Sequence, residues 1–345
     1  MKAAVYNGPG QGLRIDEVPD PTPQQGQVVV RVECACVCGT DISLTRPRDS
    51  PTLYGPIVDE LFVGGAVLGH EYGGEVIEVG PGVTSLQVGD RVAPMTFAGC
   101  GHCEQCRSGF PQGCAQATSR MGGFAQFAAV YEHASVKLPE RFSAVEGALV
   151  EPLATSLATA AVAGVSSVGR VLVLGAGALG LGVVHFAKHL GSARVAAVAR
   201  TDAKAGVARR LGADAFLTQG PDLAAEATEA LGGAPDVVIE TAGVPGLIDQ
   251  AILTVAPGGT VVSAGLSLDP EMTSHTIAAM KGLTLRYNAA YTVSDFHQVV
   301  ALLPGSGIAE SGLVGAPVAF DAFPAAFEGL HAGGAAHKVV LNPWL

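Results

Sequence analysis

A glycine-rich turn between a predicted strand and a predicted helix constrains the fold more than any other feature of the chain. Residues 171–174 read as a short buried strand, the turn Gly-Ala-Gly-Ala-Leu-Gly follows directly, and a helix is predicted over 179–190. The first glycine permits a tight turn, the second lets the backbone approach a pyrophosphate, and the third lets the helix pack on the strand. An ordinary strand–turn–helix without a ligand is the alternative, which this context disfavours. The dinucleotide-binding residues predicted from the turn are Gly175, Gly177, Ala178, Leu179 and Gly180.

Strands and helices alternate from about residue 151 onward. The predicted series continues with a strand at Arg194–Ala199, a helix over 203–211, and strands over 236–240 and Thr260–Ser263. Such alternation implies βαβ units around a doubly wound parallel sheet.

The first 150 residues have a different character. They contain short strand-like runs bounded by Gly, Pro and Asp turn signals, at residues 28–32, 74–79 and 90–93. Beyond about residue 290 the pattern becomes irregular, and it ends in a strand-like run at 338–341. With 345 residues, the chain is expected to hold two domains, on a prior of about 150 residues per domain.

The end of the second strand of the alternating region bears on the choice of coenzyme. An NAD site usually carries an acid there, about 20 residues past the glycines, to hold the ribose 2′-hydroxyl. Here Ala199 is followed by Arg200, and no acid stands at the expected tip. Arg200 could hold a 2′-phosphate through a charged fork, so NADP is favoured over NAD. In the alternative, Arg200 is a solvated surface residue and Asp202 serves the ribose.

A cluster of cysteines predicts a closed metal site. Four of the seven cysteines are spaced C-x2-C-x2-C-x7-C, which lets four thiolates surround one Zn²⁺ with no position left for water or substrate. Disulfides are the lesser alternative, because clustered cysteines in an apparently intracellular chain are more often metal ligands. An iron–sulfur cluster is also less favoured, because the fourth cysteine comes too late and no proline follows it. The predicted structural-zinc ligands are Cys100, Cys103, Cys106 and Cys114, in a lobe at about 96–115.

A reactive metal site needs about three protein ligands and one open position. Outside the cluster, the candidates are the run Cys38-Gly-Thr-Asp after a strand, the run Gly69-His-Glu before another strand, and Glu151 at the seam between the two regions. A cysteine, a histidine and an acid far apart in sequence suit a zinc site assembled by folding. Each is weak alone, because a lone cysteine is more often a small buried hydrophobe. Cys34 and Cys36, which alternate along the preceding strand, are expected only to pack.

These motifs, in this order and over nearly the whole chain, resemble the zinc-dependent alcohol and polyol dehydrogenases of the medium-chain dehydrogenase/reductase superfamily. The resemblance implies an α/β protein in which a GroES-like, β-rich catalytic domain is interrupted by a Rossmann domain. The expected boundaries are 1–150 for the GroES-like domain, 151–290 for the Rossmann domain, and 291–345 for the return to the catalytic domain. The resemblance also implies two zinc ions per chain, a nicotinamide coenzyme, and a homodimer or homotetramer.

The resemblance assigns roles to single residues. Cys38, His70 and Glu151 would be the ligands of the catalytic zinc, and Glu71 would be a nearby carboxylate able to enter or leave the metal's coordination. Thr40 would hold the substrate hydroxyl and relay its proton. Asp41 would orient the ring of the ligating histidine. Further family-like positions for binding the coenzyme are Thr155, Ala242, Gly265 and Leu266.

The implied reaction follows from the chemistry of zinc. As a Lewis acid, zinc lowers the pKa of a bound alcohol, and the alkoxide then releases a hydride to C4 of the nicotinamide. The implied function is an NAD(P)-dependent oxidoreductase acting on a secondary alcohol, polyol or sugar-like substrate, or on the matching ketone. A zinc-free reductase of the same superfamily is one alternative, and a retired dehydrogenase that only binds nucleotide is another. The presence of both predicted sets of zinc ligands counts against both alternatives.

Two features depart from the family pattern. Many relatives carry a histidine three residues after the threonine, where this chain has Ser43. A hydroxyl can pass a proton but cannot store one near neutral pH, so the relay is expected to finish at bulk water. The stretch before His70 is also long, with Pro47, Pro51 and Pro56. We expect this insertion to border the substrate pocket or to shape an oligomer contact.

Charge and hydropathy exclude two classes of partner. The net charge of −11 argues against nucleic acid, because phosphate binding needs a basic surface. The most apolar run, over 171–184, is too short and too glycine-rich for a membrane span. No basic-then-apolar leader opens the chain, so a cytoplasmic location is expected.

Overall fold

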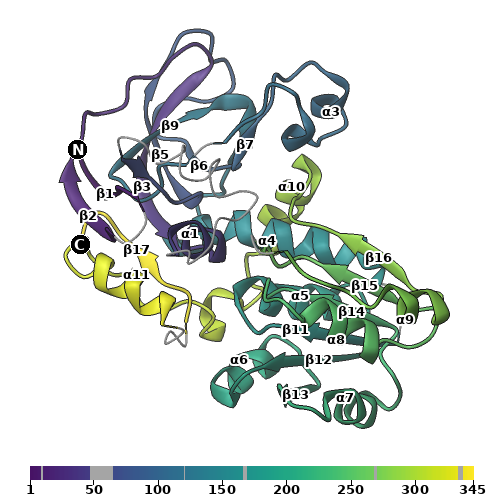
Figure 1. Ribbon diagram of the computed structural model, residues 1–345. Helices are drawn as coiled ribbons and strands as arrows, with labels where there is room; N and C mark the ends of the chain where they lie inside the picture. Colours follow the sequence, from purple (N-terminus) through teal and green to yellow (C-terminus); the bar gives the residue numbers. More distant parts are fainter. Residues whose placement is uncertain (9–10, 47–64, 120, 166–168, 268–269, 333–336) are drawn as a thin grey trace. The chain divides into compact units, whose positions relative to one another are not determined.

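The computed structural model describes residues 1–8, 11–46, 65–119, 121–165, 169–267, 270–332 and 337–345. The chain forms two compact units, and Figure 1 labels most of their helices and strands. Unit 1 comprises Met1–Pro152, Thr292–Ala309 and Val314–Leu345, and unit 2 comprises Leu153–Tyr291 and Glu310–Leu313. The domain boundaries expected at residues 150 and 290 remain predictions.

The main sheet of unit 1 is built on one long strand, β3 (Gln27–Cys36), which is buried at all but two of its positions. The sheet has the strand order β10-β6-β5-β3-β17, and β9 also pairs with β3. The last strand of the chain pairs antiparallel with the end of β3 and places Val340 opposite Cys36. The partner strands are β5 (Glu71–Val79), β6 (Arg91–Pro94), β9 (Phe127–Tyr131), β10 (Ser135–Lys137) and β17 (Val340–Leu341).

Smaller elements complete unit 1. A three-stranded sheet has the order β2-β1-β4, and β7 pairs with β8 in the cysteine lobe. These strands are β1 (Lys2–Tyr6), β2 (Leu13–Glu17), β4 (Ala66–Val67), β7 (Phe97–Ala98) and β8 (Thr118–Ser119). The short helices are α1 (Gly39–Thr45), α3 (Glu104–Arg107), η1 (Pro111–Gly113) and η2 (Glu132–Ala134).

The irregular pattern expected after residue 290 is wrong, because two helices form there: α10 (Val293–Leu302) and α11 (Phe323–His331). The first begins with a capping box, in which the Asp295 carboxylate accepts hydrogen bonds from Thr292 and the Thr292 hydroxyl accepts one from the Asp295 N–H. The second buries Phe323, whose ring packs edge-to-face on Phe124 with centroids 4.9 Å apart. Both helices are too short for the 3.6-residue period to stand out in the sequence. The short helix η5 (Ala309–Ser311) lies between them.

Unit 2 contains one parallel sheet of six strands in the order β13-β12-β11-β14-β15-β16. Counted from β11, this is the order 3-2-1-4-5-6 of doubly wound dinucleotide-binding folds. The predicted α/β fold class is therefore confirmed. The strands are β11 (Arg170–Leu174), β12 (Arg194–Ala199), β13 (Ala215–Thr218), β14 (Val237–Glu240), β15 (Thr260–Ser263) and β16 (Thr284–Tyr287).

The helices of unit 2 pack on this sheet. Leu172 and Leu174 share a core cluster with Leu223 and Ile252 of two helices, so alternate positions of β11 face that layer. The predicted helix over 203–211 is observed as a short 3-10 turn followed by a short α-helix. The helices are α5 (Ala178–His189), η4 (Asp202–Lys204), α6 (Ala205–Arg210), α7 (Leu223–Leu231), α8 (Leu247–Thr254) and α9 (His275–Met280).

One helix, α4 (Ala144–Val162), is long and apolar enough by length and composition to cross a membrane. Of the most apolar stretch of this helix, 72% is buried inside the protein, which is typical of a core helix. Glu151 lies in the middle of this helix and is itself buried. A carboxylate in an apolar core helix needs a partner, which points to a site beside it.

Candidate functional site

Three predicted metal ligands lie together in unit 1. The ligand atoms of Cys38, His70 and Glu71 lie within 4.8 Å of one another. Cys38 directly precedes α1, and the other two residues stand at the beginning of β5. His70 is 6% exposed and Glu71 is 1% exposed, so these two side chains are shielded from water, while Cys38 is half-buried.

Strand register explains why residues distant in sequence meet here. Strands β3 and β5 pair antiparallel, with Cys36 opposite Glu71. The chain leaves β3 and enters β5 at the same end of the pair, so Cys38 and His70 come into reach of each other. Gly69 makes the entry possible: its φ is +86°, and a side-chain carbon there would lie 2.5 Å from the Phe124 ring.

Asp41 lies close to both the cysteine and the histidine. Its Oδ2 accepts a hydrogen bond of 2.9 Å from the Cys38 N–H, and its Oδ1 lies 3.7 Å from His70 Nδ1. The side chain is completely buried. Because the Nδ1 edge of the ring faces Asp41, Nε2 is the histidine nitrogen available to a metal.

The electrostatics of the group favour a bound cation. Burial raises the pKa of Cys38, and the neighbouring Glu71 charge raises it further, so the thiolate needs a positive charge nearby. Burial opposes a charged His70, but the charges of Cys38 and Asp41 raise its pKa well above the usual value. Thiolate, imidazole and carboxylate are the donors that zinc binds in proteins. The residues present therefore fit a zinc ion.

Glu151 lies near this group without belonging to its compact part. Its charge acts on His70, but its oxygens are not among the atoms that lie within 4.8 Å of one another. The Thr96 hydroxyl donates a hydrogen bond of 2.8 Å to Glu151 Oε1, and both side chains are buried. The structure thus brings two carboxylates to the site. Glu71 lies within 4.8 Å of the cysteine and histidine ligand atoms, and Glu151 is hydrogen-bonded to Thr96 nearby.

Two residues of this site were not predicted, Thr96 and Lys338. Lys338 Nζ lies 2.5 Å from Glu71 Oε2 and donates a hydrogen bond of 2.9 Å to the Val37 carbonyl. The one signal in the sequence is a lysine at the start of the apolar run Lys-Val-Val-Leu, since a lysine in a buried strand needs an acidic partner. Thr96 offers no comparable signal.

The four-cysteine lobe, which surrounds α3 in Figure 1, forms a second metal-ligand group. Its four sulfur atoms lie within 4.8 Å of one another, and all seven cysteines of the chain are free of disulfides. Backbone N–H groups point at the sulfurs: Cys103 donates to Cys100 Sγ at 3.3 Å, and Gln116 donates to Cys114 Sγ at 3.3 Å. The backbone N–H groups of His102 and Cys103 lower the pKa of Cys100 to about 6, which favours the thiolate that zinc binds. This group fits a closed, structural zinc.

The glycine turn of unit 2 joins β11 to α5 as predicted. Gly175 has φ +110°, and a side-chain carbon there would lie 2.7 Å from Thr241 Oγ1. A side-chain carbon on Gly180 would collide with the Gly175 carbonyl, so helix and turn can pack closely only with glycine. Gly177 differs: it is exposed, it caps the N-terminus of α5, and nothing lies within 4 Å of the position of its missing side chain. Ala178 and Leu179 form the first turn of this helix. The turn therefore leaves open space at a helix N-terminus, where a pyrophosphate binds.

The switch point of the sheet lies between β11 and β14, and two further loops end there. Glu240, the last residue of β14, accepts hydrogen bonds from the N–H groups of Ala242 and Gly243 at 2.6 and 2.8 Å. Gly265 packs so closely on Gly243 that a side chain at Gly265 would collide with it. Ala242 is exposed and Leu266 is 52% exposed, so both are accessible beside the crevice in which such sheets bind ligands.

The remaining predicted coenzyme residues lie in unit 2 as well. Ala199 ends β12, and Arg200 follows it with an exposed side chain. Within the described parts of the chain, Arg200 forms no ion pair. Thr155 is half-buried in α4. Asp202, the alternative ribose partner, is exposed in η4.

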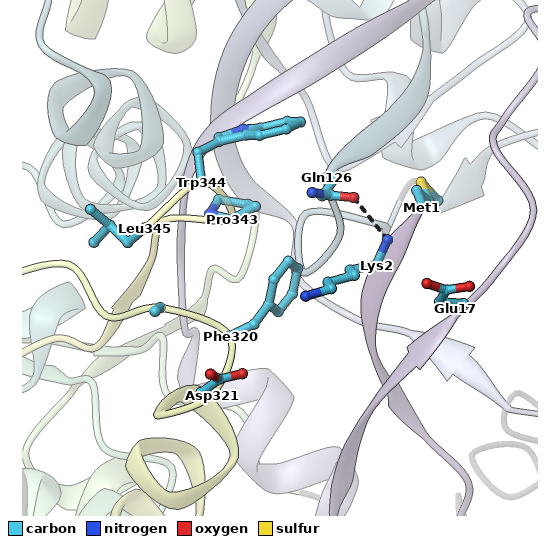
Figure 2. Close-up of a pocket in the computed structure, with 10 residues that line it drawn as sticks. Met1, Lys2, Glu17, Gln126, Phe320, Asp321, Pro343, Trp344 and Leu345 are labelled. Carbon is cyan, nitrogen blue, oxygen red and sulfur yellow. Dashed lines mark hydrogen bonds between the residues drawn. The ribbon is translucent and has the colours of Figure 1, made fainter.

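A separate cavity of about 450 Å³ opens elsewhere in unit 1. Figure 2 shows it, with the Lys2 N–H donating a hydrogen bond of 2.9 Å to the Gln126 side chain. None of its described lining residues is a predicted ligand or coenzyme residue. Its lining residues are Met1, Lys2, Glu17, Gln126, Ala319, Phe320, Asp321, Pro343, Trp344 and Leu345.

Of the two features that depart from the family pattern, the structure describes only one. Ser43 lies in α1 and is half-buried, two residues after Asp41. The proline-rich insertion predicted to border the substrate pocket falls on residues 47–64, outside the described residues.

Two protein-family models match the chain. The alcohol dehydrogenase GroES-like domain matches residues 24–140, and the zinc-binding dehydrogenase domain matches residues 178–304. Among curated proteins, the chain is similar to an L-threonine 3-dehydrogenase of Saccharopolyspora erythraea, with 31% identity over 99% of each chain. It is also similar to the (R,R)-butanediol dehydrogenase of Bacillus subtilis, with 33% identity over 76% of each chain.

Solved structures agree with these relatives. Compared with this chain, the structure of an alcohol dehydrogenase from Escherichia coli in complex with NADH has a TM-score of 0.84 and 27% sequence identity, over 99% of each chain. A zinc-binding dehydrogenase from Sinorhizobium meliloti bound to NADP has a TM-score of 0.82 and 26% identity over 99% of each chain. The chain therefore belongs to the zinc-dependent alcohol and polyol dehydrogenases of the medium-chain dehydrogenase/reductase superfamily, enzymes that transfer a hydride between an alcohol or its ketone and a nicotinamide coenzyme.

Proposed function

We propose that this enzyme oxidises a secondary alcohol, polyol or sugar-like substrate, or reduces the matching ketone, at a zinc ion held in unit 1. One observation carries the proposal: the ligand atoms of Cys38, His70 and Glu71 lie within 4.8 Å of one another, and the histidine and the carboxylate are buried. A zinc-free reductase of the superfamily would have no use for such a group. A retired dehydrogenase would have no reason to keep both this group and an intact nucleotide turn.

In this proposal each chain holds two zinc ions. Cys38, His70 and Glu151 hold the catalytic ion, and Glu71 stands beside them as a carboxylate able to enter or leave the coordination. The structural ion is held by the four cysteines of the lobe. Three protein ligands leave a position for substrate at the first ion, whereas four leave none at the second.

The residues around the catalytic group then have distinct tasks. When bound, zinc supplies a Lewis acid that favours the ionised form of an alcohol and polarises a carbonyl. Thr40, whose Oγ1 lies 3.6 Å from Cys38 Sγ, binds the substrate hydroxyl. Its hydroxyl group accepts the proton of the substrate and at the same time donates its own proton to the next group of the relay. Ser43, one turn further along α1, continues the relay toward water. Asp41 keeps the His70 ring oriented.

NADP is the favoured coenzyme. Arg200 is exposed directly after β12, where an NAD enzyme usually has an acid. No carboxylate of the described chain is paired with it, so its guanidinium is free to form a bidentate contact with a 2′-phosphate. The glycine turn holds the pyrophosphate, and Thr155, Ala242, Gly265 and Leu266 hold the nicotinamide half.

The substrate class follows from the relatives only by analogy. Threonine and butanediol each carry a hydroxyl group next to a carbon with a second polar substituent. We therefore extend the proposal to secondary alcohols with a polar neighbour, such as vicinal diols and amino alcohols. A polar neighbour gives the site a second group to bind, and so fixes which carbon faces the coenzyme.

We also propose a homodimer or homotetramer in the cytoplasm. Strand β16 ends the sheet of unit 2, and an edge strand offers unpaired backbone groups to a second copy. Tyr287 on this strand is 71% exposed, and Met280 just before it is 84% exposed. Seven cysteines without a disulfide suit a reducing compartment.

The experiment that tests the proposed function combines metal analysis with a substrate screen. We expect two zinc ions per chain, and reduction of NADP in the presence of vicinal diols or amino alcohols, followed by the absorbance of the reduced nicotinamide. Unbranched primary alcohols serve as controls and should react more slowly. A single zinc per chain, with no turnover of any alcohol by either coenzyme, would contradict the proposal.

A further inference from the structure

We propose that Lys338 holds the Glu71 carboxylate outside the coordination of the catalytic metal and thereby keeps one metal position open for the substrate. Lys338 is thus a positioning residue, because it acts through Glu71 and touches neither substrate nor coenzyme. The inference rests on the proposed zinc site of Cys38, His70 and Glu151.

The contacts of Lys338 are specific and buried. Its Nζ lies 2.5 Å from Glu71 Oε2 and donates a hydrogen bond of 2.9 Å to the Val37 carbonyl. The side chains of the lysine and the glutamate are 5% and 2% exposed. The ammonium group is therefore fixed by one hydrogen bond and one ion pair, and little water competes for it.

The backbone fixes the lysine in this position. The Val37 N–H donates to the Val339 carbonyl at 2.9 Å, and the Gly315 N–H donates to the Lys338 carbonyl at 3.0 Å. Lys338 thus stands just before β17, the strand that pairs with the end of β3. The return of the C-terminal segment to unit 1 delivers this charge to the metal group.

Charge balance requires such a cation. The site gathers the thiol of Cys38 and the buried carboxyl groups of Asp41, Glu71 and Glu151, whereas a divalent metal supplies only two positive charges. The ammonium group of Lys338 forms an ion pair with one of these carboxylates, so it adds a positive charge that the metal does not supply.

Without the lysine, Glu71 would compete for the metal. It already lies in the compact group with Cys38 and His70, while Thr96 restrains Glu151 at the edge. If Glu71 joined the other three ligands, the metal would have four protein ligands and the closed coordination of a structural site. Moving Glu71 onto the metal would leave Lys338 buried without its partner, which is strongly unfavourable.

The test uses the full-length enzyme with cobalt(II) in place of zinc at the catalytic site, because the visible spectrum of cobalt reports the number and kind of its ligands. Metal analysis of the unmodified enzyme comes first. If it finds no metal outside the four-cysteine lobe, the proposed zinc site itself fails, and this outcome is distinct from a failure of the role of Lys338.

We expect Lys338→Met to change the cobalt spectrum and to slow metal removal by a chelator by about tenfold or more, the range over which residues beyond the ligands tune metal sites. Turnover should fall in parallel. Adding Glu71→Gln to Lys338→Met should restore the spectrum and the chelation rate of the unmodified enzyme. Lys338→Arg, which keeps the charge, is the matched control and should leave the spectrum unchanged.

Two results would overturn the proposal. One is a Lys338→Met spectrum identical to that of the unmodified enzyme, with metal removal equally fast or faster. The other is a Glu71→Gln spectrum that differs from the unmodified enzyme, since Glu71 would then be a ligand despite the lysine. Glu71→Gln keeps the test decisive even if Lys338→Met does not fold, and an unchanged spectrum in that variant supports the proposal.

Discussion

The two units assemble their sites in contrasting ways. In unit 2 the turn Gly175–Gly180 is a continuous piece of chain between β11 and α5, and its shape follows from local backbone conformation. In unit 1 the metal group comes from the ends of β3 and β5 and from the segment before β17, which only the pairing register brings together. A local site can be read from the sequence as a motif. A site that depends on strand pairing shows in the sequence only as separate residues whose side chains could bind the same metal.

The contrast predicts that changes in unit 1 act on the metal and leave coenzyme binding intact. Cys38→Ala removes a thiolate ligand, so we expect turnover to fall about a thousandfold, since the Lewis acid contributes several kcal/mol. Zinc content should fall from two ions per chain to one, while coenzyme binding, followed by fluorescence titration, stays unchanged. Cys34→Ala, at a buried cysteine four residues earlier on β3, is the control and should retain both metals. Full activity of Cys38→Ala would rule out the ligand assignment.

The converse prediction concerns the glycine turn. Gly177 has an ordinary φ of −74°, and nothing lies within 4 Å of a side chain built there, so Gly177→Ala should fold normally. The added methyl group would occupy the space of the pyrophosphate, and we expect KM for the coenzyme to rise about tenfold or more. Metal content and melting temperature should not change. Gly206→Ala, on an exposed position of α6, is the control. An unaltered KM in Gly177→Ala would place the pyrophosphate elsewhere.

The same contrast explains what sequence reasoning could reach. The strands Arg194–Ala199 and Thr260–Ser263 are observed where they were predicted, because continuous apolar runs bounded by turn residues are local signals. Lys338 and Val37 are 301 residues apart in sequence, and their contact depends on the pairing of β17 with β3. No sequence pattern encodes that pairing. Thr96 was missed for the same reason, because its partner Glu151 is 55 residues away.

A smaller effect is expected in unit 2 from a substitution that changes the preference between NADP and NAD. Arg200→Asp replaces a phosphate partner with a like charge, so we expect the NADP Kd to rise about tenfold or more, while the NAD Kd changes little. Arg194→Asp, at the opposite end of the same strand, is the control and should change neither. Equal weakening of both coenzymes would remove the argument for a 2′-phosphate contact.

The smallest expected effect is on the stability of unit 2. The Arg170 hydrogen bonds, opposed in part by burial, hold the pKa of Asp236 below its usual range, so this carboxylate stabilises the fold when ionised. That contribution is present above the unfolded pKa of about 3.9 and is lost as pH falls through the lower folded value. Because the pair is about one-third exposed, Asp236→Asn should lower Tm by only about 2–4 °C at pH 7.

The pH dependence separates this pair from a simple loss of packing. The Tm difference between Asp236→Asn and the unmodified enzyme should shrink below about pH 4. Asp16→Asn removes a more exposed pair with Arg14 and should have no measurable effect at any pH. A Tm difference that stays constant from pH 7 to pH 3 would mean that charge is not the source of the effect.

The central claim is that unit 1 holds a second, reactive zinc ion apart from the four-cysteine lobe. Diffraction from a crystal of the enzyme at the zinc absorption edge tests it most directly. We predict two anomalous peaks per chain, one within the four sulfurs of the lobe and one about 2.0–2.3 Å from Cys38 Sγ and from a His70 nitrogen. A peak in the lobe alone, with no peak at Cys38 in a crystal grown with zinc, would contradict the account.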